Sequence, residues 1–193
     1  MLRTFSARSV VRSIRLFIFS SLACAAVALP SLAQAQVVVA VVGDSNVAGK
    51  GVPASENYPA KLERALKARG LDVRVTNGGV NGDTSAGLLS RIDSAAPQGT
   101  QVAVVWAGIN DFKRGVSRDK IRDNLTSVAS RLKARGIEVV VIKADVHGDL
   151  HKNPKYVIAG DPELHLQPSG YDVVLARTLP QIEPLVARLG KRN

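Results

Sequence analysis

Cysteine and aromatic residues are scarce in this chain of 193 residues. Cys24 is the single cysteine, and Phe, Trp and Tyr together make up 4% of the sequence. One thiol cannot form an intramolecular disulfide, and Cys24 lies in an N-terminal segment that we expect to be removed. Disulfide bonds and thiol catalysis are therefore excluded for the mature protein.

The positive charge of the chain is not gathered in one place. The formal net charge is +10, but the lysines and arginines are spread over predicted helix faces and the terminal Lys191-Arg192 pair. Nucleic-acid binding favours a basic stripe, usually with aromatic side chains on which bases stack, and this sequence has few of these. We interpret the charge as a solvated basic surface and expect no nucleic-acid partner.

The first 35 residues are typical of a secretory signal peptide. A basic head precedes a short apolar core over residues 16–29, and Ala33-Gln34-Ala35 has the small-x-small pattern of a cleavage site. The apolar run is short for a membrane span, and Cys24 lies inside it, which disfavours a lipoprotein. We expect cleavage after Ala35, export to the periplasm or the medium, and no stable membrane anchor. The mature chain 36–193 would carry a net charge of +6, because the leader contains Arg3, Arg8, Arg12 and Arg15.

Apolar runs with the length of strands alternate with amphipathic stretches throughout residues 36–193. This alternation is typical of βαβ units with a parallel sheet covered on both faces. No internal repeat, linker or low-complexity segment divides the chain. We predict one α/β domain, a three-layer α/β/α sandwich with a parallel sheet of about five strands. Strands are expected over 37–42, 72–76, 101–107, 138–142 and 156–159, and helices over 58–69, 84–93, 119–134 and a C-terminal stretch that Pro180 kinks or splits.

Ser45 stands directly after the first predicted strand. Six apolar residues end at Val42, the chain turns at Gly43, and a hydroxyl follows in Gly43-Asp44-Ser45-Asn46. Ligands of parallel α/β sheets bind at the carboxyl ends of the strands. Ser45 is therefore a candidate nucleophile if a base lies beside it.

Three further positions fall at strand ends or just before a helix. Gly82 follows the second strand in Asn81-Gly82-Asp83-Thr84, and Asn110 follows the third in Gly108-Ile109-Asn110-Asp111. His165 lies in a loop before the C-terminal helix. One edge of one sheet can gather all of them with Ser45.

The order of these four segments resembles the SGNH (GDSL-type) hydrolase family. Each segment is short, but four in order over nearly the whole mature chain are a strong signal. The resemblance implies a flavodoxin-like fold and an esterase or lysophospholipase-like activity with no cofactor. It implies that Ser45 is the nucleophile and His165 the base. The implied oxyanion hole consists of the Ser45 N–H, the Gly82 N–H and the Asn110 side-chain amide, and loss of one such donor costs about 10²–10³ in rate.

The acid of the expected triad departs from the family pattern. The family usually places it three residues before the histidine, and Pro162 stands there. Asp161 lies four residues before His165, and Glu163 lies two before it. We choose Asp161 as the carboxylate that orients the imidazole, because a loop can absorb a shift of one residue, and keep Glu163 as the alternative.

Supporting roles are expected for other residues of the pattern. A glycine at position 82 would let the backbone approach the substrate closely, since it carries no Cβ. Asp44 and Asp111 are expected to hold loops by accepting hydrogen bonds from nearby backbone N–H groups.

Three other motifs are incomplete. Gly43 to Lys50 looks like a phosphate-binding loop, but five residues separate its glycines and Gly51 stands where Ser or Thr is needed. Residues 145–149 resemble the first metal motif of calcineurin-like phosphoesterases, but the required Asn-His pair does not follow, so we interpret them as a polar loop near the site. Val47 replaces the last glycine of G-x-S-x-G, which excludes the α/β-hydrolase elbow.

We therefore predict an exported serine esterase that hydrolyses carboxylic ester or thioester bonds through an acyl-enzyme on Ser45. One alternative is a carbohydrate O-deacetylase or acyltransferase that uses the same site. The other is a non-catalytic binding domain that retained the fold. We expect a small-molecule or acylated substrate, no metal or organic cofactor, and a monomer. The mature length leaves little room for a large lid, which favours small or exposed acyl groups.

Overall fold

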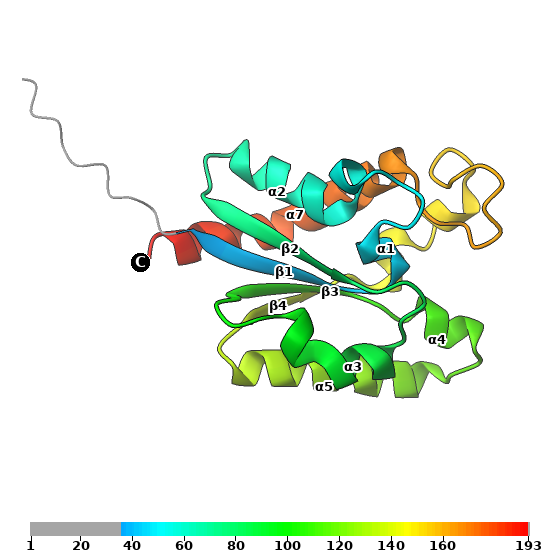
Figure 1. Cartoon of the computed structure of the whole chain (residues 1–193), viewed down its shortest axis with the longest axis horizontal. Coiled ribbons are helices and arrows are strands. Elements are labelled where there is room, and N and C mark those ends of the chain that lie inside the picture. The colour runs from blue at the N-terminus through cyan, green and yellow to red at the C-terminus, as the bar shows by residue number, and fades with distance from the viewer. Residues whose placement is uncertain (1–35, 193) are drawn as a thin grey trace, which may run out of the picture. The chain divides into compact units, whose positions relative to one another are not determined.

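Four parallel strands form the centre of the protein (Figure 1). The computed structural model describes residues 36–192, so the predicted signal peptide over 1–35 lies outside the described residues. The spatial order of the strands is β2-β1-β3-β4. The strands are β1 (Val37–Gly43), β2 (Val73–Gly79), β3 (Val102–Trp106) and β4 (Glu138–Val141).

The central strand β1 is buried on both faces, which explains why it is apolar without alternation. Val39 and Val41 pack into a core cluster on one face of the sheet. Ala40 and Val42 pack into a second cluster on the opposite face. A sheet with two apolar faces must be covered twice, so the alternation of strands and helices in the sequence leads to three layers.

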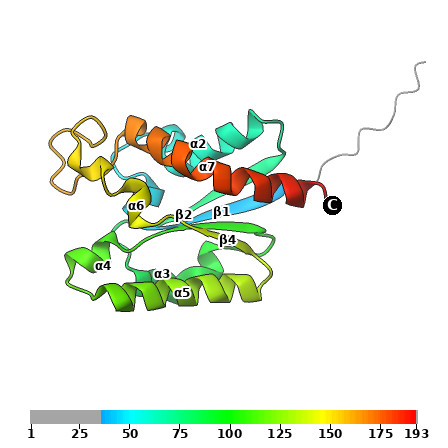
Figure 2. The ribbon, with the colours of Figure 1, turned by 180° about the vertical axis from the view of Figure 1, so that it is seen from behind.

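Two helices cover each face of the sheet (Figures 1 and 2). Helices α2 (Tyr58–Lys67) and α7 (Pro168–Gly190) cover one face, and their side chains share a core with β1 and β3. Helices α3 (Ser85–Ala95) and α5 (Arg118–Ala134) cover the other face. The three-layer α/β/α prediction is confirmed.

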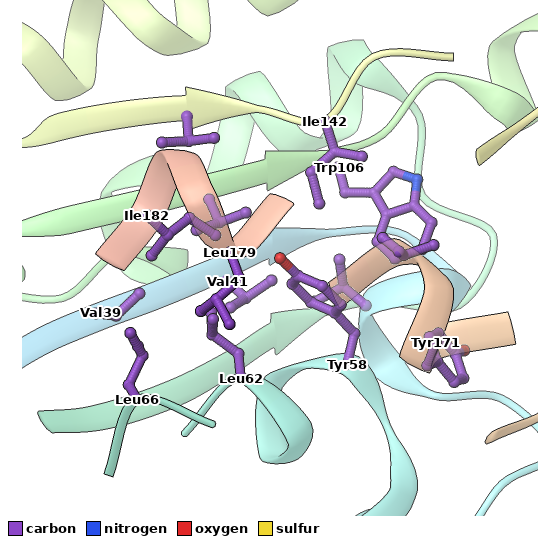
Figure 3. Close-up of a cluster of buried hydrophobic side chains, with 14 of the residues drawn as sticks. Val39, Val41, Tyr58, Leu62, Leu66, Trp106, Ile142, Tyr171, Leu179 and Ile182 are labelled. Carbon is purple, nitrogen blue, oxygen red and sulfur yellow. The ribbon is translucent and has the colours of Figure 1, made fainter. Parts of the chain in front are cut away.

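The core under α2 and α7 contains the largest buried side chains (Figure 3). Tyr58 of α2 and Trp106 of β3 meet edge to face, with ring centroids 5.6 Å apart. Tyr171 of α7 also packs edge to face with Trp106, with ring centroids 6.3 Å apart. Trp106 is the last residue of β3, so this aromatic group lies at the carboxyl end of the sheet, beneath the polar loops.

Short helices follow the carboxyl ends of three strands. Helix α1 (Ser45–Ala48) follows β1, α4 (Ile109–Lys113) follows β3, and α6 (Ala144–His147) follows β4. They lie at the same end of the sheet as the loop that precedes α7 (Figures 1 and 2). Two 3-10 turns complete the chain, η1 (Ala54–Glu56) and η2 (Leu150–Lys152).

Two details of the expected fold are wrong. Residues 156–159 do not form a fifth strand of the sheet but make an isolated antiparallel bridge, Val157 with Leu166. The Gly160-Asp161-Pro162 turn sends the chain back on itself, so this segment pairs locally instead of joining β4. Pro180 does not split the last helix, because α7 runs through it and buries Leu179 and Ile182 on both sides.

None of the helices in residues 36–192 combines the length and the apolar character needed to cross a membrane.

Candidate active site

The turn from β1 into α1 presents Ser45. Asp44 caps α1 with its carboxylate, which accepts a hydrogen bond of 2.9 Å from the Asn46 N–H. Gly43 pairs with Trp106 on β3, and a Cβ at Gly43 would lie 1.8 Å from the Trp106 carbonyl oxygen. Only glycine fits there, so the strand end comes close enough to β3 to fix the position of the hydroxyl.

Ser45 and His165 meet although 120 residues separate them. The distance from His165 Nε2 to Ser45 Oγ is 3.0 Å, and both side chains are buried. On the other side of the ring, Nδ1 lies 2.6 Å from Asp161 Oδ2. The carboxylate accepts the Nδ1 hydrogen, which leaves Nε2 of the neutral ring free to accept the serine proton.

Asp161 is held by backbone as well as by the ring. Its carboxylate accepts hydrogen bonds from the N–H of Glu163 at 3.0 Å and from the N–H of His165 at 2.8 Å. Burial raises the pKa of Asp161, but these two N–H groups and the His165 ring outweigh it and lower the pKa to about 2. Asp161 therefore stays ionised across the neutral range.

Glu163 lies on the opposite side of the imidazole. Its Oε2 is 3.6 Å from His165 Nε2 and pairs with Lys50 Nζ. Both side chains of this ion pair are about half exposed, and the hydrogen bond from Lys50 lowers the pKa of Glu163. Glu163 thus faces Nε2, the ring nitrogen beside Ser45 Oγ, and Asp161 alone of the two carboxylates contacts Nδ1.

The three expected oxyanion donors lie at the same sheet edge, Ser45 at the start of α1, Gly82 in the loop after β2 and Asn110 in α4. Within residues 36–192, the N–H groups of Ser45 and Gly82 donate no hydrogen bond. The Asn110 amide donates one hydrogen to the Asp83 carbonyl at 2.8 Å, which leaves its second N–H. This bond ties the Gly82 loop to α4.

Gly82 has a backbone conformation that favours glycine. Its φ is +76°, in the left-handed region, and a Cβ there would meet no atom of the protein within 4 Å. The backbone therefore accounts for a glycine at this position, and the expected close approach to the substrate stays a prediction.

Sequence reasoning missed Arg91, which connects the nucleophile turn to the Gly82 loop. Its guanidinium donates to the carbonyls of Gly43 at 2.9 Å and Gly78 at 3.0 Å, and it pairs with Asp83 at 2.7 Å. The one signal in the sequence is an arginine within an otherwise amphipathic helix, and this pattern does not identify its partners.

A buried network under α4 was expected only in part. Asp111 accepts hydrogen bonds from the Ser85 N–H at 2.7 Å and the Ser85 hydroxyl at 2.6 Å, and Asn124 Nδ2 donates to that hydroxyl at 2.9 Å. The prediction that Asp44 and Asp111 accept from backbone N–H groups is confirmed. Nothing in the sequence indicates the roles of Ser85 and Asn124, because the network joins three helices that are distant in the sequence. Ser85 belongs to α3, Asp111 to α4 and Asn124 to α5.

The cavity beside the hydroxyl has a volume of about 100 Å³. Its lining combines the reactive side chains with apolar and cationic ones. The lining residues are Ser45, Asn46, Ile109, Lys113, His151, Glu163, Leu164 and His165.

The motif at 145–149 forms no metal cluster with other described side chains. The Asp145 side chain lies outside the described part, His147 is buried against Trp106, and Asp149 pairs with Arg177 of α7. Among described side chains, Asp161, Glu163 and His165 have potential ligand atoms within 4.8 Å of one another. A cation there would compete with the hydrogen bond that the His165 ring donates to Asp161 and with Lys50, which pairs with Glu163.

A family model described as "GDSL-like Lipase/Acylhydrolase family" matches residues 41–154. The chain belongs to this family. The matched range contains Ser45, Gly82 and Asn110 and ends before Asp161 and His165. The family assignment and the hydrolysis of ester bonds are thereby established for this GDSL-like acylhydrolase. The roles of Asp161 and His165 as acid and base stay predictions, which the contacts described above support.

Curated relatives of the acylhydrolase are esterases. It is 33% identical over 137 residues to "Esterase TesA" from Pseudomonas aeruginosa, covering 70% of this chain and 67% of the relative. It is 34% identical over 119 residues to "Arylesterase" from Vibrio mimicus, covering 61% of this chain and 60% of the relative.

Solved structures share its architecture. A crystal structure of TesA superposes with a TM-score of 0.63 at 26% identity, covering 77% of this chain and 99% of that chain. The SGNH-hydrolase family esterase AlinE4 superposes with a TM-score of 0.57 at 27% identity, covering 78% and 96%. The fold class is confirmed.

Proposed function

We propose that this GDSL-like acylhydrolase is an exported esterase that cleaves carboxylic ester or thioester bonds through an acyl-enzyme on Ser45. The observation that carries the proposal is the continuous hydrogen-bond chain from Ser45 through His165 to Asp161. Serine becomes a nucleophile when a positioned base accepts its proton, and both distances in this chain are within hydrogen-bond range.

In the acylation step, Ser45 Oγ attacks the acyl carbon while His165 Nε2 takes the hydroxyl proton. The carbonyl π electrons move onto oxygen, and the oxyanion binds the N–H groups of Ser45 and Gly82 with the free amide N–H of Asn110. Asp161 stabilises the imidazolium that forms. When the tetrahedral intermediate collapses, the bond to the leaving oxygen or sulfur breaks and Nε2 returns the proton to that atom.

In the deacylation step, water replaces the alcohol or thiol. His165 Nε2 takes a proton from the water as its oxygen bonds to the acyl carbon. The bond to Ser45 Oγ then breaks, the serine recovers its proton from Nε2, and a carboxylic acid leaves. No metal or organic cofactor takes part in either step.

The surroundings of the hydroxyl favour a short or exposed acyl group. The cavity of about 100 Å³ is small, and Ile109 and Leu164 supply its apolar lining. The large hydrophobic side chains most exposed within residues 36–192 are Val80, Phe112 and Leu164. All three belong to loops or short helices at the carboxyl edge, where an acyl chain that outgrows the cavity would find apolar contacts.

Three substitutions test the assignment, with p-nitrophenyl acetate as substrate and the mature chain 36–193 as enzyme. In Ser45→Ala we expect kcat/KM to fall by about 10³–10⁶-fold, and in Asp161→Ala by about 10²–10⁴-fold. Glu163→Gln is the comparison variant, because Glu163 lines the cavity but does not contact Nδ1, and its loss of activity should be much smaller than that of Asp161→Ala. Full activity in Ser45→Ala would remove the nucleophile assignment, and a loss in Glu163→Gln equal to that in Asp161→Ala would reassign the acid.

Export and monomeric state are tested on the full chain expressed in a bacterium. N-terminal sequencing of the exported protein should begin at Gln36, and light scattering should give the mass of one mature chain. Retention of residues 1–35 on an active protein would contradict export by cleavage.

A further inference from the structure

The turn between the acid and the base contains an unusual backbone conformation. Leu164 has a φ of +57°, the only positive value at a non-glycine residue within 36–192. A leucine in the left-handed region is strained, because its Cβ crowds the following carbonyl oxygen. This conformation absorbs the extra residue between Asp161 and His165, and the surrounding structure must hold it in place.

His151 holds the carbonyl of this residue. Its Nδ1 lies 2.9 Å from the Leu164 oxygen. A carbonyl oxygen only accepts hydrogen bonds, so Nδ1 of His151 carries the hydrogen and donates it. The Leu164 carbonyl belongs to the peptide group that also supplies the N–H of His165, and that N–H donates to Asp161.

A second histidine links His151 to the core. His147 Nδ1 lies 3.2 Å from His151 Nε2, the ring nitrogen of His151 that does not face Leu164. His147 is buried and its ring lies 5.2 Å from that of Trp106, centroid to centroid. A chain of contacts therefore runs from the end of β3 through both histidines to the strained peptide group.

We propose that His151 is a positioning residue that holds the Leu164–His165 peptide group so that His165 reaches Ser45. The inference rests on the proposed role of His165 as the base. Without the hydrogen bond, Leu164 relaxes toward negative φ, the peptide group rotates, and His165 Nε2 moves away from Ser45 Oγ. A displacement of about 1 Å at a reacting group costs about 100-fold in rate.

Three substitutions of His151 separate its two nitrogens. Asparagine places its Nδ2 near the position of the histidine Nδ1 and keeps the donor to Leu164, whereas glutamine places its amide nearer the position of Nε2. With p-nitrophenyl acetate we expect His151→Leu and His151→Gln to lower kcat by about 10–100-fold and His151→Asn to stay within about threefold of wild type. KM should change by less than about threefold in all three, because the proposed role of His151 is to hold the Leu164–His165 peptide group and not to bind substrate, although its side chain is part of the cavity lining.

A second substitution tests the strain itself. Glycine adopts positive φ without cost, so Leu164→Gly in the His151→Leu background should recover at least about threefold in kcat. Arg188→Gln, which breaks an ion pair with Glu138 at the opposite end of the sheet, is the control and should leave kcat unchanged.

Several outcomes would overturn the proposal. A change in KM alone would make His151 a substrate contact, and equal kcat values for the asparagine and glutamine variants would remove the Nδ1 donor from the argument. If His151→Leu fails to fold by circular dichroism, the asparagine–glutamine comparison still decides. Full activity in Ser45→Ala would instead refute the proposed function, so the two failures are distinguishable.

Discussion

Asp44 is a buried carboxylate beside the nucleophile, and it should make the stability of the protein depend on pH. Its side chain is 0% exposed, and its Oδ2 has no hydrogen-bond partner among the described residues. Burial raises the pKa of Asp44 from 3.8 to about 6, although the Asn46 N–H and side chain lower it in part. The nearby charges of Asp83 and Asp111 contribute to this rise in the pKa of Asp44.

The direction of the effect follows from which state ionises first. Below about pH 4, Asp44 is protonated in both the folded and the unfolded chain, and its ionisation costs nothing. Between pH 4 and 6 the unfolded chain ionises while the folded carboxyl keeps its proton, so the free energy of unfolding falls as pH rises. Above pH 6 the folded carboxyl is ionised as well, and the free energy of unfolding is lowered by the full cost of ionising it in its buried site. A shift of about two pKa units corresponds to about 3 kcal/mol.

Asp44→Asn removes this charge and keeps the cap of α1, because asparagine still offers an oxygen to the Asn46 N–H. We expect the stability of the variant relative to wild type to rise by about 3 kcal/mol between pH 4 and pH 7. The measurement is urea unfolding of both proteins at pH 4, 5, 6 and 7. Other titrating groups are the same in both proteins and cancel in the difference.

The exposed Asp119 is the matched control, since its side chain is 77% exposed. Asp119→Asn should give a stability difference that varies by less than about 1 kcal/mol over the same pH range. A difference between wild type and Asp44→Asn that is constant with pH would refute the reasoning, because it would mean that the folded carboxyl ionises at its ordinary pKa.

Two further predictions concern the loops around the site. Gly79→Ala should lower the free energy of unfolding by about 3 kcal/mol, because the new Cβ would lie 2.1 Å from the Ala48 backbone nitrogen. Urea unfolding measures this change. A loss no larger than about 1 kcal/mol would show that α1 can shift to make room. Asp111→Ala should lower the free energy of unfolding by about 2–4 kcal/mol, because the N–H and the hydroxyl of Ser85 lose their buried acceptor. The variant should also have a lower kcat, because Asp111 adjoins Asn110. Unchanged stability and kcat would contradict this prediction.

Local signals were enough to predict most of the strand ends and the position of Ser45 at the end of the first strand. The run that ends at Val42 is apolar because β1 is buried on both faces, and Ser45 lies where the sequence predicts it. The sheet is nevertheless one strand smaller than expected. An apolar run of the length of 156–159 does not reveal whether its partner is β4 or the segment at Leu166, since periodicity carries no information on pairing.

The sequence led us to choose Asp161 over Glu163 as the carboxylate beside His165, and Asp161 is the one of the two that contacts Nδ1. The turn between Asp161 and His165 contains Leu164 at positive φ, and nothing in a leucine signals such a conformation. Arg91 and His151 act through partners many positions away, so their roles depend on the folded arrangement.

The bridge between Val157 and Leu166 closes the hairpin that contains both the proposed acid, Asp161, and the proposed base, His165. Asp161 and His165 lie on one small hairpin, so their mutual contact depends on the ten residues 157–166. Their distance from Ser45 depends instead on how that hairpin packs against the sheet. Two of the three residues of the proposed triad therefore lie on one short local segment, residues 157–166. We expect that this segment can be exchanged as a unit where the surface on which it packs is kept.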